Sequence, residues 1–114
     1  MFASVEDILQ ELSRLKYELL PESEIEIVYK RIDRVSIRVV LSPILFIDIY
    51  ANVKNGRYDF CLMKDNKRIF GCDNLGGWHR HTLNSPDKHI ECKEPSSTEQ
   101  ILKEITVIIH TLRK

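Results

Sequence analysis

A chain of 114 residues has the length of a single domain, and we expect residues 1–114 to form one. The hydrophobic content of 43% is typical of a globular protein and excludes a disordered chain. Basic and acidic side chains both number 17, so any binding to nucleic acid or an anionic membrane must come from a local patch.

The first predicted element is a helix over residues 4–19. Ser4 can cap its N-terminus, with Asp7 in the capping-box position three residues later, and Pro21 ends it. Its apolar stripe, at helical spacing, consists of Val5, Ile8, Leu9, Leu12, Leu15 and Leu19. A second stripe follows Pro95 and several capping residues, which predicts a helix at the C-terminal end.

Between the helices, apolar and polar side chains alternate with the period of strands. The five predicted strands lie near residues 24–30, 34–41, 45–53, 57–64 and 67–73. We therefore predict an α+β fold: a five-stranded antiparallel meander with an N-terminal and a C-terminal helix on one face.

Short turns fix the expected register of this sheet, and Asn55-Gly56 is the strongest hairpin signal among them. The turns at 42–44, 55–56 and 65–66 pair Val39 with Ile47, Ala51 with Phe60, and Phe60 with Gly71. All apolar members then share one face, which both helices can cover.

The same register puts Glu26, Arg38 and Asp48 side by side on the opposite face, where a cross-strand ion ladder is expected. The larger side chains on that face are Phe46, Tyr50, Phe70, Cys61 and Met63. Two helices leave this face uncovered, and an exposed apolar patch usually marks a contact surface. We expect a homodimer or a protein partner there, with stacking of RNA bases on the rings as an alternative.

The segment from 73 to 94 holds three of the four histidines, namely His79, His81 and His89. Asn74-Leu-Gly-Gly and Ser85-Pro86-Asp87 favour loops within it. If residues 79–81 are extended, the rings of His79 and His81 lie on one face with Arg80 opposite.

Histidine is suited to proton transfer near neutral pH, so this segment could supply the base and acid for cleaving a phosphodiester. Lys88 and Arg80 could stabilise the phosphate charge. The histidines and Asp73 could instead bind zinc or manganese. A polar loop whose histidines only satisfy backbone groups is the third interpretation.

The three cysteines, Cys61, Cys72 and Cys92, include no Cys-x-x-Cys motif. An odd number argues against a disulfide framework and favours a reducing compartment. The first residues are acidic where a secretory signal is basic, and the longest apolar runs are too short to span a membrane. We expect a cytoplasmic protein without membrane contacts.

The last third of the chain resembles the TumE family, small proteins described as the toxin halves of bacterial and archaeal type II toxin–antitoxin pairs. The resemblance is carried by Phe70-Gly-Cys-Asp-Asn, His79-Arg-His and Pro86-Asp-Lys-His-Ile, followed by a helix. Cys72 departs from it, since the family usually has an aromatic residue there, and the helix at 4–19 has no counterpart. The resemblance implies an antitoxin partner and a target in translation or RNA.

We therefore predict a toxin-like component of a toxin–antitoxin pair that acts as, or derives from, a ribonuclease. The expected catalytic residues are His81 and His89 as base and acid, with Asp73 orienting a histidine and His79 beside them. The expected substrate-binding residues are Lys88, Arg80 and Asn74. The cofactor is either none or a divalent metal at the histidine cluster. The alternatives are a non-enzymatic RNA- or protein-binding module and a structural homodimer.

Overall fold

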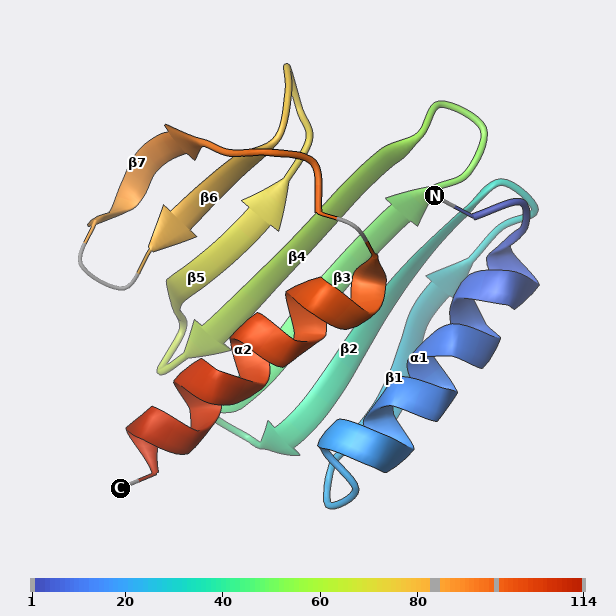
Figure 1. Ribbon diagram of the computed structural model, residues 1–114. Helices are drawn as coiled ribbons and strands as arrows, with labels where there is room; N and C mark the ends of the chain where they lie inside the picture. The colour runs from blue at the N-terminus through green and yellow to red at the C-terminus, as the bar shows by residue number, and fades with distance from the viewer. Residues whose placement is uncertain (1, 83–84, 96, 114) are drawn as a thin grey trace.

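The computed structural model describes residues 2–82, 85–95 and 97–113, and for residues 85–89 it describes the backbone alone. Within these residues the chain forms two helices and one seven-stranded antiparallel sheet (Figure 1). The elements in chain order are α1 Val5–Leu19, β1 Glu24–Lys30, β2 Arg34–Ser42, β3 Leu45–Asn52, β4 Arg57–Lys64, β5 Lys67–Asp73, β6 His79–Thr82, β7 Ser85–Glu91 and α2 Thr98–Leu112. Each strand pairs with its neighbours in sequence, so β1 and β7 are the edges.

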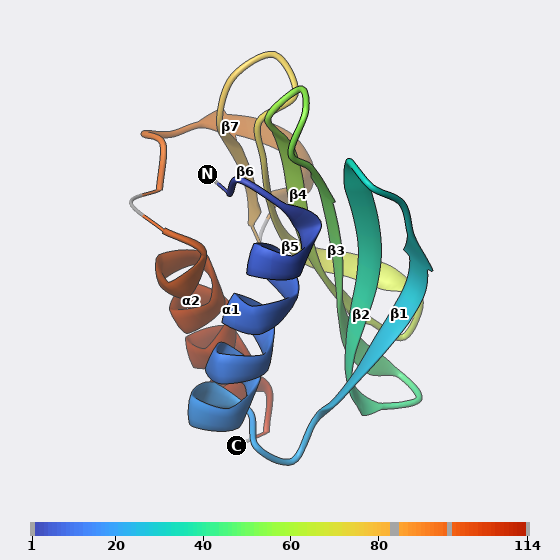
Figure 2. The ribbon, with the colours of Figure 1, turned by 90° about the vertical axis from the view of Figure 1, so that its right-hand side faces the viewer.

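Both helices lie on the same side of the sheet, as predicted (Figure 2). The Ser4 hydroxyl accepts a hydrogen bond from the Asp7 amide at 3.1 Å and caps α1, and Ser97 caps α2 in the same way through Gln100. Their buried stripes comprise Val5, Ile8, Leu12 and Leu15 in α1 and Ile101, Leu102, Ile105 and Ile109 in α2. These side chains pack on one face of the sheet, and we call the other side the open face.

The predicted pairing of β1, β2 and β3 is confirmed up to Val40, but the turn is one residue shorter than the predicted 42–44, because Ser42 lies opposite Leu45 after an irregularity in β2. Val39 pairs with Ile47, and the row Glu26, Arg38 and Asp48 crosses the open face. The Arg38 guanidinium donates two hydrogen bonds to the Asp48 carboxylate, at 2.8 and 3.3 Å.

The predicted two-residue turn at Asn55-Gly56 is wrong. The pairing ends at Asn52 and Arg57, so the loop contains four residues. The Asn52 side-chain oxygen accepts hydrogen bonds from the Lys54 and Asn55 amides, which stabilises this longer turn. Ala51 therefore pairs with Tyr58 and not with Phe60, but a slip of two residues leaves every side chain on its expected face.

The predicted turn at Asp65-Asn66 is present. Both residues have positive φ, 51° and 63°, as a type I′ turn requires. A bulge between Leu62 and Met63 then shifts the register by one, and Leu62 pairs with Phe70. Phe70 consequently lies in the core with 5% of its surface exposed, which corrects the prediction that it lies on the open face.

The sheet has two strands more than predicted. Strands β6 and β7 lie in the histidine segment, where loops were expected at 74–77 and 85–87; residues 85–87 instead begin β7, and β6 pairs with both β5 and β7. These short strands are stabilised by ladder pairing and carry no apolar alternation that would reveal them.

The expected reason for dimerisation is also corrected. Phe46 is on the open face but only 9% exposed, because the Arg38 guanidinium lies 4.0 Å over its ring. Phe46 and Phe70 are thus buried within one chain and need no partner. Neither helix in the described part of the chain is long and apolar enough to cross a membrane.

Candidate functional site

Two rows of side chains cross the open face from β3 to β6. Residues directly opposite each other on paired strands share a face, so each row can be read from the register. The first row is Tyr50, Asp59, Asp73 and His79, and the second is Asp48, Cys61, Gly71 and His81. The predicted arrangement of His79 and His81 on one face with Arg80 opposite is therefore confirmed.

Asp73 and His81 form the centre of the site. His81 Nε2 lies 3.2 Å from Asp73 Oδ2, and the residues are only 1% and 8% exposed. The other carboxylate oxygen, Asp73 Oδ1, accepts a hydrogen bond from the Leu75 amide at 3.0 Å. Both oxygens of Asp73 thus have partners, and the pair has a fixed orientation below the surface.

Gly71 provides the space for this pair. It is the residue opposite His81, and a Cβ atom at this position would lie 3.3 Å from His81 Cδ2 and 3.4 Å from Arg68 Cδ. Glycine inside a strand often marks such a close approach of another group. The missing side chain therefore allows the His81 ring to lean along the sheet to Asp73 in the other row.

Asp59 is a site residue that was missed in the sequence. The bulge in β4 places it opposite Asp73, whereas the predicted register paired Asp73 with Tyr58. Burial raises the pKa of the Asp59 carboxyl, and the negative charge of Asp73 raises it further, against the opposing effects of Arg57, Arg68 and His81. A half-buried carboxyl with a raised pKa is typical of functional sites. The only signal in the sequence was its place among the polar residues of an alternating strand.

His79 is the more accessible histidine of the two. It is opposite Asp73 at the start of β6 and is half-buried, next to Gly77, whose positive φ of 113° begins the turn into the strand. Asp73, His79 and His81 are thus brought together as expected.

Arg80 does not join this cluster. It lies on the helix side of β6, where its guanidinium donates to the Glu104 carboxylate of α2 at 2.8 and 3.1 Å. Asn74 is near the cluster, but its side chain accepts from the Tyr58 amide at 2.8 Å and donates to the Gly56 carbonyl at 2.7 Å. The roles expected for Arg80 and Asn74 as substrate ligands are therefore corrected to structural ones.

The side chains of Lys88 and His89 lie outside the described residues. Their backbone belongs to β7, in which the next residue, Ile90, pairs with Arg80. Whether His89 faces His81 stays a prediction.

No group of three or more histidine, cysteine or acidic side chains in the described part of the chain is arranged to hold a metal ion. The predicted zinc or manganese set includes His89 and so lies partly outside that part. Burial raises the pKa of both the Cys61 and the Cys72 thiols to about 12. These two thiols are therefore protonated near neutral pH, which makes them poor nucleophiles and poor metal ligands.

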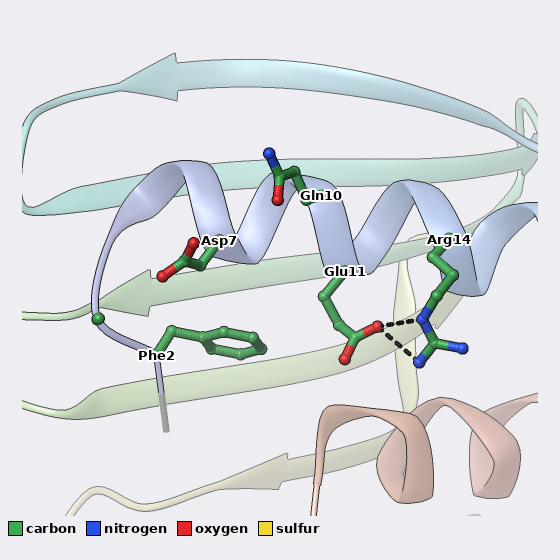
Figure 3. Close-up of a pocket in the computed structure, with 6 residues that line it drawn as sticks. Phe2, Asp7, Gln10, Glu11 and Arg14 are labelled. Carbon is green, nitrogen blue, oxygen red and sulfur yellow. Dashed lines mark hydrogen bonds and ion pairs between the residues drawn. The ribbon is translucent and has the colours of Figure 1, made fainter.

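The surface has one hollow beside α1 and another on the open face. One, of about 450 Å³, lies beside the first turns of α1 and is lined by residues such as Phe2, Glu11 and Arg14 (Figure 3). It contains no histidine, and Arg14 is engaged by Glu11 at 2.6 Å. The other, of about 200 Å³, lies on the open face and includes Asp59 in its wall.

The open face thus combines a buried histidine–aspartate pair, a half-buried histidine and a carboxyl with a raised pKa. Arg57 adds a cation beside Asp59; its Nε is buried and has no hydrogen-bond partner among the described residues. Together these groups can donate, accept and stabilise charge within one surface. Comparison with known proteins gives no matching family model, no matching curated protein and no matching solved structure.

Proposed function

We propose that this chain is a toxin-like protein that cleaves RNA with acid–base groups on the open face of β4–β6, and that an antitoxin protein restrains it. The observation that carries the proposal is the hydrogen bond of 3.2 Å between Asp73 and His81 on the open face. Asp73 lies in the same row as Asp59 and His79, with Asp59 on one side and His79 on the other. The resemblance of the same segment to a toxin family gives the biological setting.

The reaction needs a base and an acid. The base takes the proton of a ribose 2′-hydroxyl, whose oxygen attacks the neighbouring phosphorus, and the acid protonates the 5′-oxygen that leaves. The products are a 2′,3′-cyclic phosphate and a free 5′-hydroxyl. Both groups must reach the substrate, which favours half-buried side chains over buried ones.

His79 and Asp59 meet this requirement. They are two strands apart, which puts their Cα atoms about 10 Å from each other and leaves room for a phosphate between their side chains. The raised pKa of Asp59 keeps a proton available closer to neutral pH than an ordinary carboxyl would. His81, which is 1% exposed, and Asp73 are positioning residues in this proposal.

The phosphate charge requires a cation, and Arg57 supports this role. It is two residues from Asp59 on the open face, and the Nη atoms of its guanidinium can donate to a phosphate oxygen. The roles that the sequence predicts for Lys88 and His89 stay predictions, because their side chains lie outside the described residues.

The test is cleavage of single-stranded RNA by the purified protein, with detection of the cyclic phosphate end. We expect His79→Ala and Asp59→Asn each to lower kcat by about 10²- to 10⁴-fold. His110→Ala is the matched control, because His110 is exposed on α2. Activity should survive EDTA, since protein side chains transfer the protons. Full activity in both site variants would refute the proposal.

A second candidate is non-catalytic binding of a protein through β1. This edge exposes Ile27 by 51% and Val28 by 59%, and Ile32 in the following turn by 95%. An edge strand has unpaired backbone groups that accept another strand. We infer that the occupant is a basic strand of a different protein, because Glu24 and Glu26 are both exposed on this edge strand, on the open face of the sheet. A homodimer is disfavoured in the register centred on Ile25, where antiparallel self-pairing sets Glu24 of one copy against Glu26 of the other.

A further inference from the structure

The hollow of about 200 Å³ on the open face lies next to the proposed acid–base cluster. Its wall includes Ser36, Arg38, Asp48, Tyr50, Asp59 and Cys61, from strands β2, β3 and β4. Asp59 belongs to both the hollow and the cluster, so a group held in the hollow lies directly beside the reacting groups. Nothing in the chemistry described above uses the β2–β3 side of this hollow.

We propose that this hollow is the nucleobase subsite of the protein and that it takes guanine from an RNA chain. The proposal rests on the proposed ribonuclease function and names its substrate preference. A volume of about 200 Å³ is smaller than the roughly 300–1,000 Å³ of sites for drug-sized ligands. It suits one planar ring system better than a whole nucleotide or a peptide.

Tyr50 supplies a stacking surface. Its ring is half-buried in the wall of the hollow, and the Arg57 guanidinium lies 5.7 Å from the ring centroid. Aromatic rings and guanidinium planes are the groups on which proteins stack single-stranded RNA bases. Because Tyr50 is opposite Asp59 in the first row, a base stacked there directs its ribose and phosphate toward β4 and β5.

Asp48 supplies the hydrogen-bonding edge. Each of its carboxylate oxygens accepts one bond from Arg38, and each can accept a second. Arg38 also lies 4.0 Å over the Phe46 ring, so the ion pair is held in one orientation. The wall therefore offers acceptors at Asp48, beside donors at the remaining N–H groups of Arg38 and the Ser36 hydroxyl. Guanine offers two adjacent donors, N1–H and the N2 amino group, which match the two oxygens of one carboxylate.

The arrangement orders three functions across the strands of the open face, from β3 to β6. The base lies over Asp48 and Tyr50 on β3, the phosphate lies near Arg57 and Asp59 on β4, and the second proton-transfer group is His79 on β6. This order predicts cleavage on the 3′ side of guanosine.

The experiment measures binding of the four nucleoside 5′-monophosphates by NMR titration, and maps the cleavage sites in a single-stranded RNA of mixed sequence. Guanosine monophosphate should bind at least tenfold tighter than uridine monophosphate and shift amides of β2–β4. Tyr50→Leu should weaken this binding by about 5- to 150-fold, whereas Tyr50→Phe, which keeps the ring, should change it only a few-fold. Asp48→Asn should remove the preference for guanine. Tyr17→Leu is the matched control, since Tyr17 is 79% exposed on α1.

The outcomes separate this inference from the ribonuclease proposal. RNA cleavage without a base preference, or with a cleavage pattern that Tyr50→Leu leaves unchanged, overturns the guanine subsite while the ribonuclease stands. Binding of guanosine monophosphate that depends on Tyr50, in a protein that cleaves no RNA, supports the subsite and removes the ribonuclease. Amide shifts confined to surfaces outside β2–β4 overturn the subsite as well.

Discussion

His81 is a polar side chain in a place where proteins usually put apolar ones. Its burial is tolerated because Asp73 Oδ2 lies 3.2 Å away and because Gly71 leaves room for the ring. The pair is thus a structural feature of the fold as well as the proposed centre of the site. This dual role changes what a substitution at His81 should do.

We expect His81→Ala to lower the free energy of unfolding by about 2–4 kcal/mol, because it leaves both a cavity and a buried carboxylate without its partner. His79→Ala, at a half-exposed position, should cost about 1 kcal/mol or less. Urea denaturation of the two variants makes the comparison. The difference follows from burial, since His81 is 1% exposed and His79 is half-buried. Equal stability of the two variants would contradict the buried pair.

Asp59 should give the protein a distinct pH dependence. Burial, then the charge of Asp73, raises its pKa in the folded chain. Such an acid stabilises the fold while it is protonated, and that contribution is lost as the pH rises through the folded pKa. Asp59→Asn should therefore match the wild type near pH 4, about the unfolded pKa of aspartate, and exceed it in Tm near pH 7.

The matched control for this measurement is Asp65→Asn, in an exposed turn whose positive φ asparagine also tolerates. Its Tm difference from the wild type should not grow between the two pH values. If the Tm difference between Asp59→Asn and the wild type is also the same at both pH values, the surroundings of Asp59 do not perturb its carboxyl.

At the scale of the elements, the Arg80–Glu104 ion pair joins β6 to α2. Arg80 donates twice to Glu104, and their side chains are 20% and 35% exposed. A double-mutant cycle of Arg80→Ala and Glu104→Gln should give a coupling energy of about 0.5–1.5 kcal/mol. RNA cleavage should be unchanged in Arg80→Ala, because this side chain is on the helix side of the sheet. A large loss of activity in Arg80→Ala with unchanged stability would show that Arg80 takes part in the site.

The elements with regular apolar spacing could be predicted from the sequence. Both helices and strands β1 to β5 were found because each carries a stripe or an alternation that one buried face requires. The faces were right even where the turn at 55–56 was wrong, since a slip of two residues preserves the alternation.

The remaining elements have no such signal. Strand β6, His-Arg-His-Thr, is polar throughout, and its place depends on backbone pairing with β5. The bulge beside Leu62 depends on which side chains pack best, and the residues of the hairpin turn do not predict it. That bulge moved Phe70 into the core and brought Asp59 opposite Asp73. The His79–His81 part of the site could therefore be predicted, but its acidic partner Asp59 could not.

At the scale of the whole molecule, two helices on one face leave the other face of the sheet as a polar surface crossed by paired charges. The equal numbers of acidic and basic residues mean that the proposed binding of RNA would depend on a few local contacts and not on a general field. This layout separates three surfaces: the helices stabilise the fold, the open face carries the proposed chemistry, and the β1 edge is the proposed site for a protein partner.

The last prediction concerns that edge. We expect the wild-type protein to be a monomer by light scattering at micromolar concentration, because self-pairing of β1 in the register centred on Ile25 sets Glu24 against Glu26. The twofold axis of such a dimer creates the Glu24–Glu26 contact twice. Glu24→Lys converts both contacts into opposite-charge pairs and leaves the exposed Ile27 and Val28 in place. This variant should therefore shift toward dimer at low salt and return to monomer at high salt, since exposed charges are screened. Glu94→Lys, at an exposed position before α2, is the control and should stay monomeric. A wild-type dimer would show that another surface, or another register of β1, mediates association.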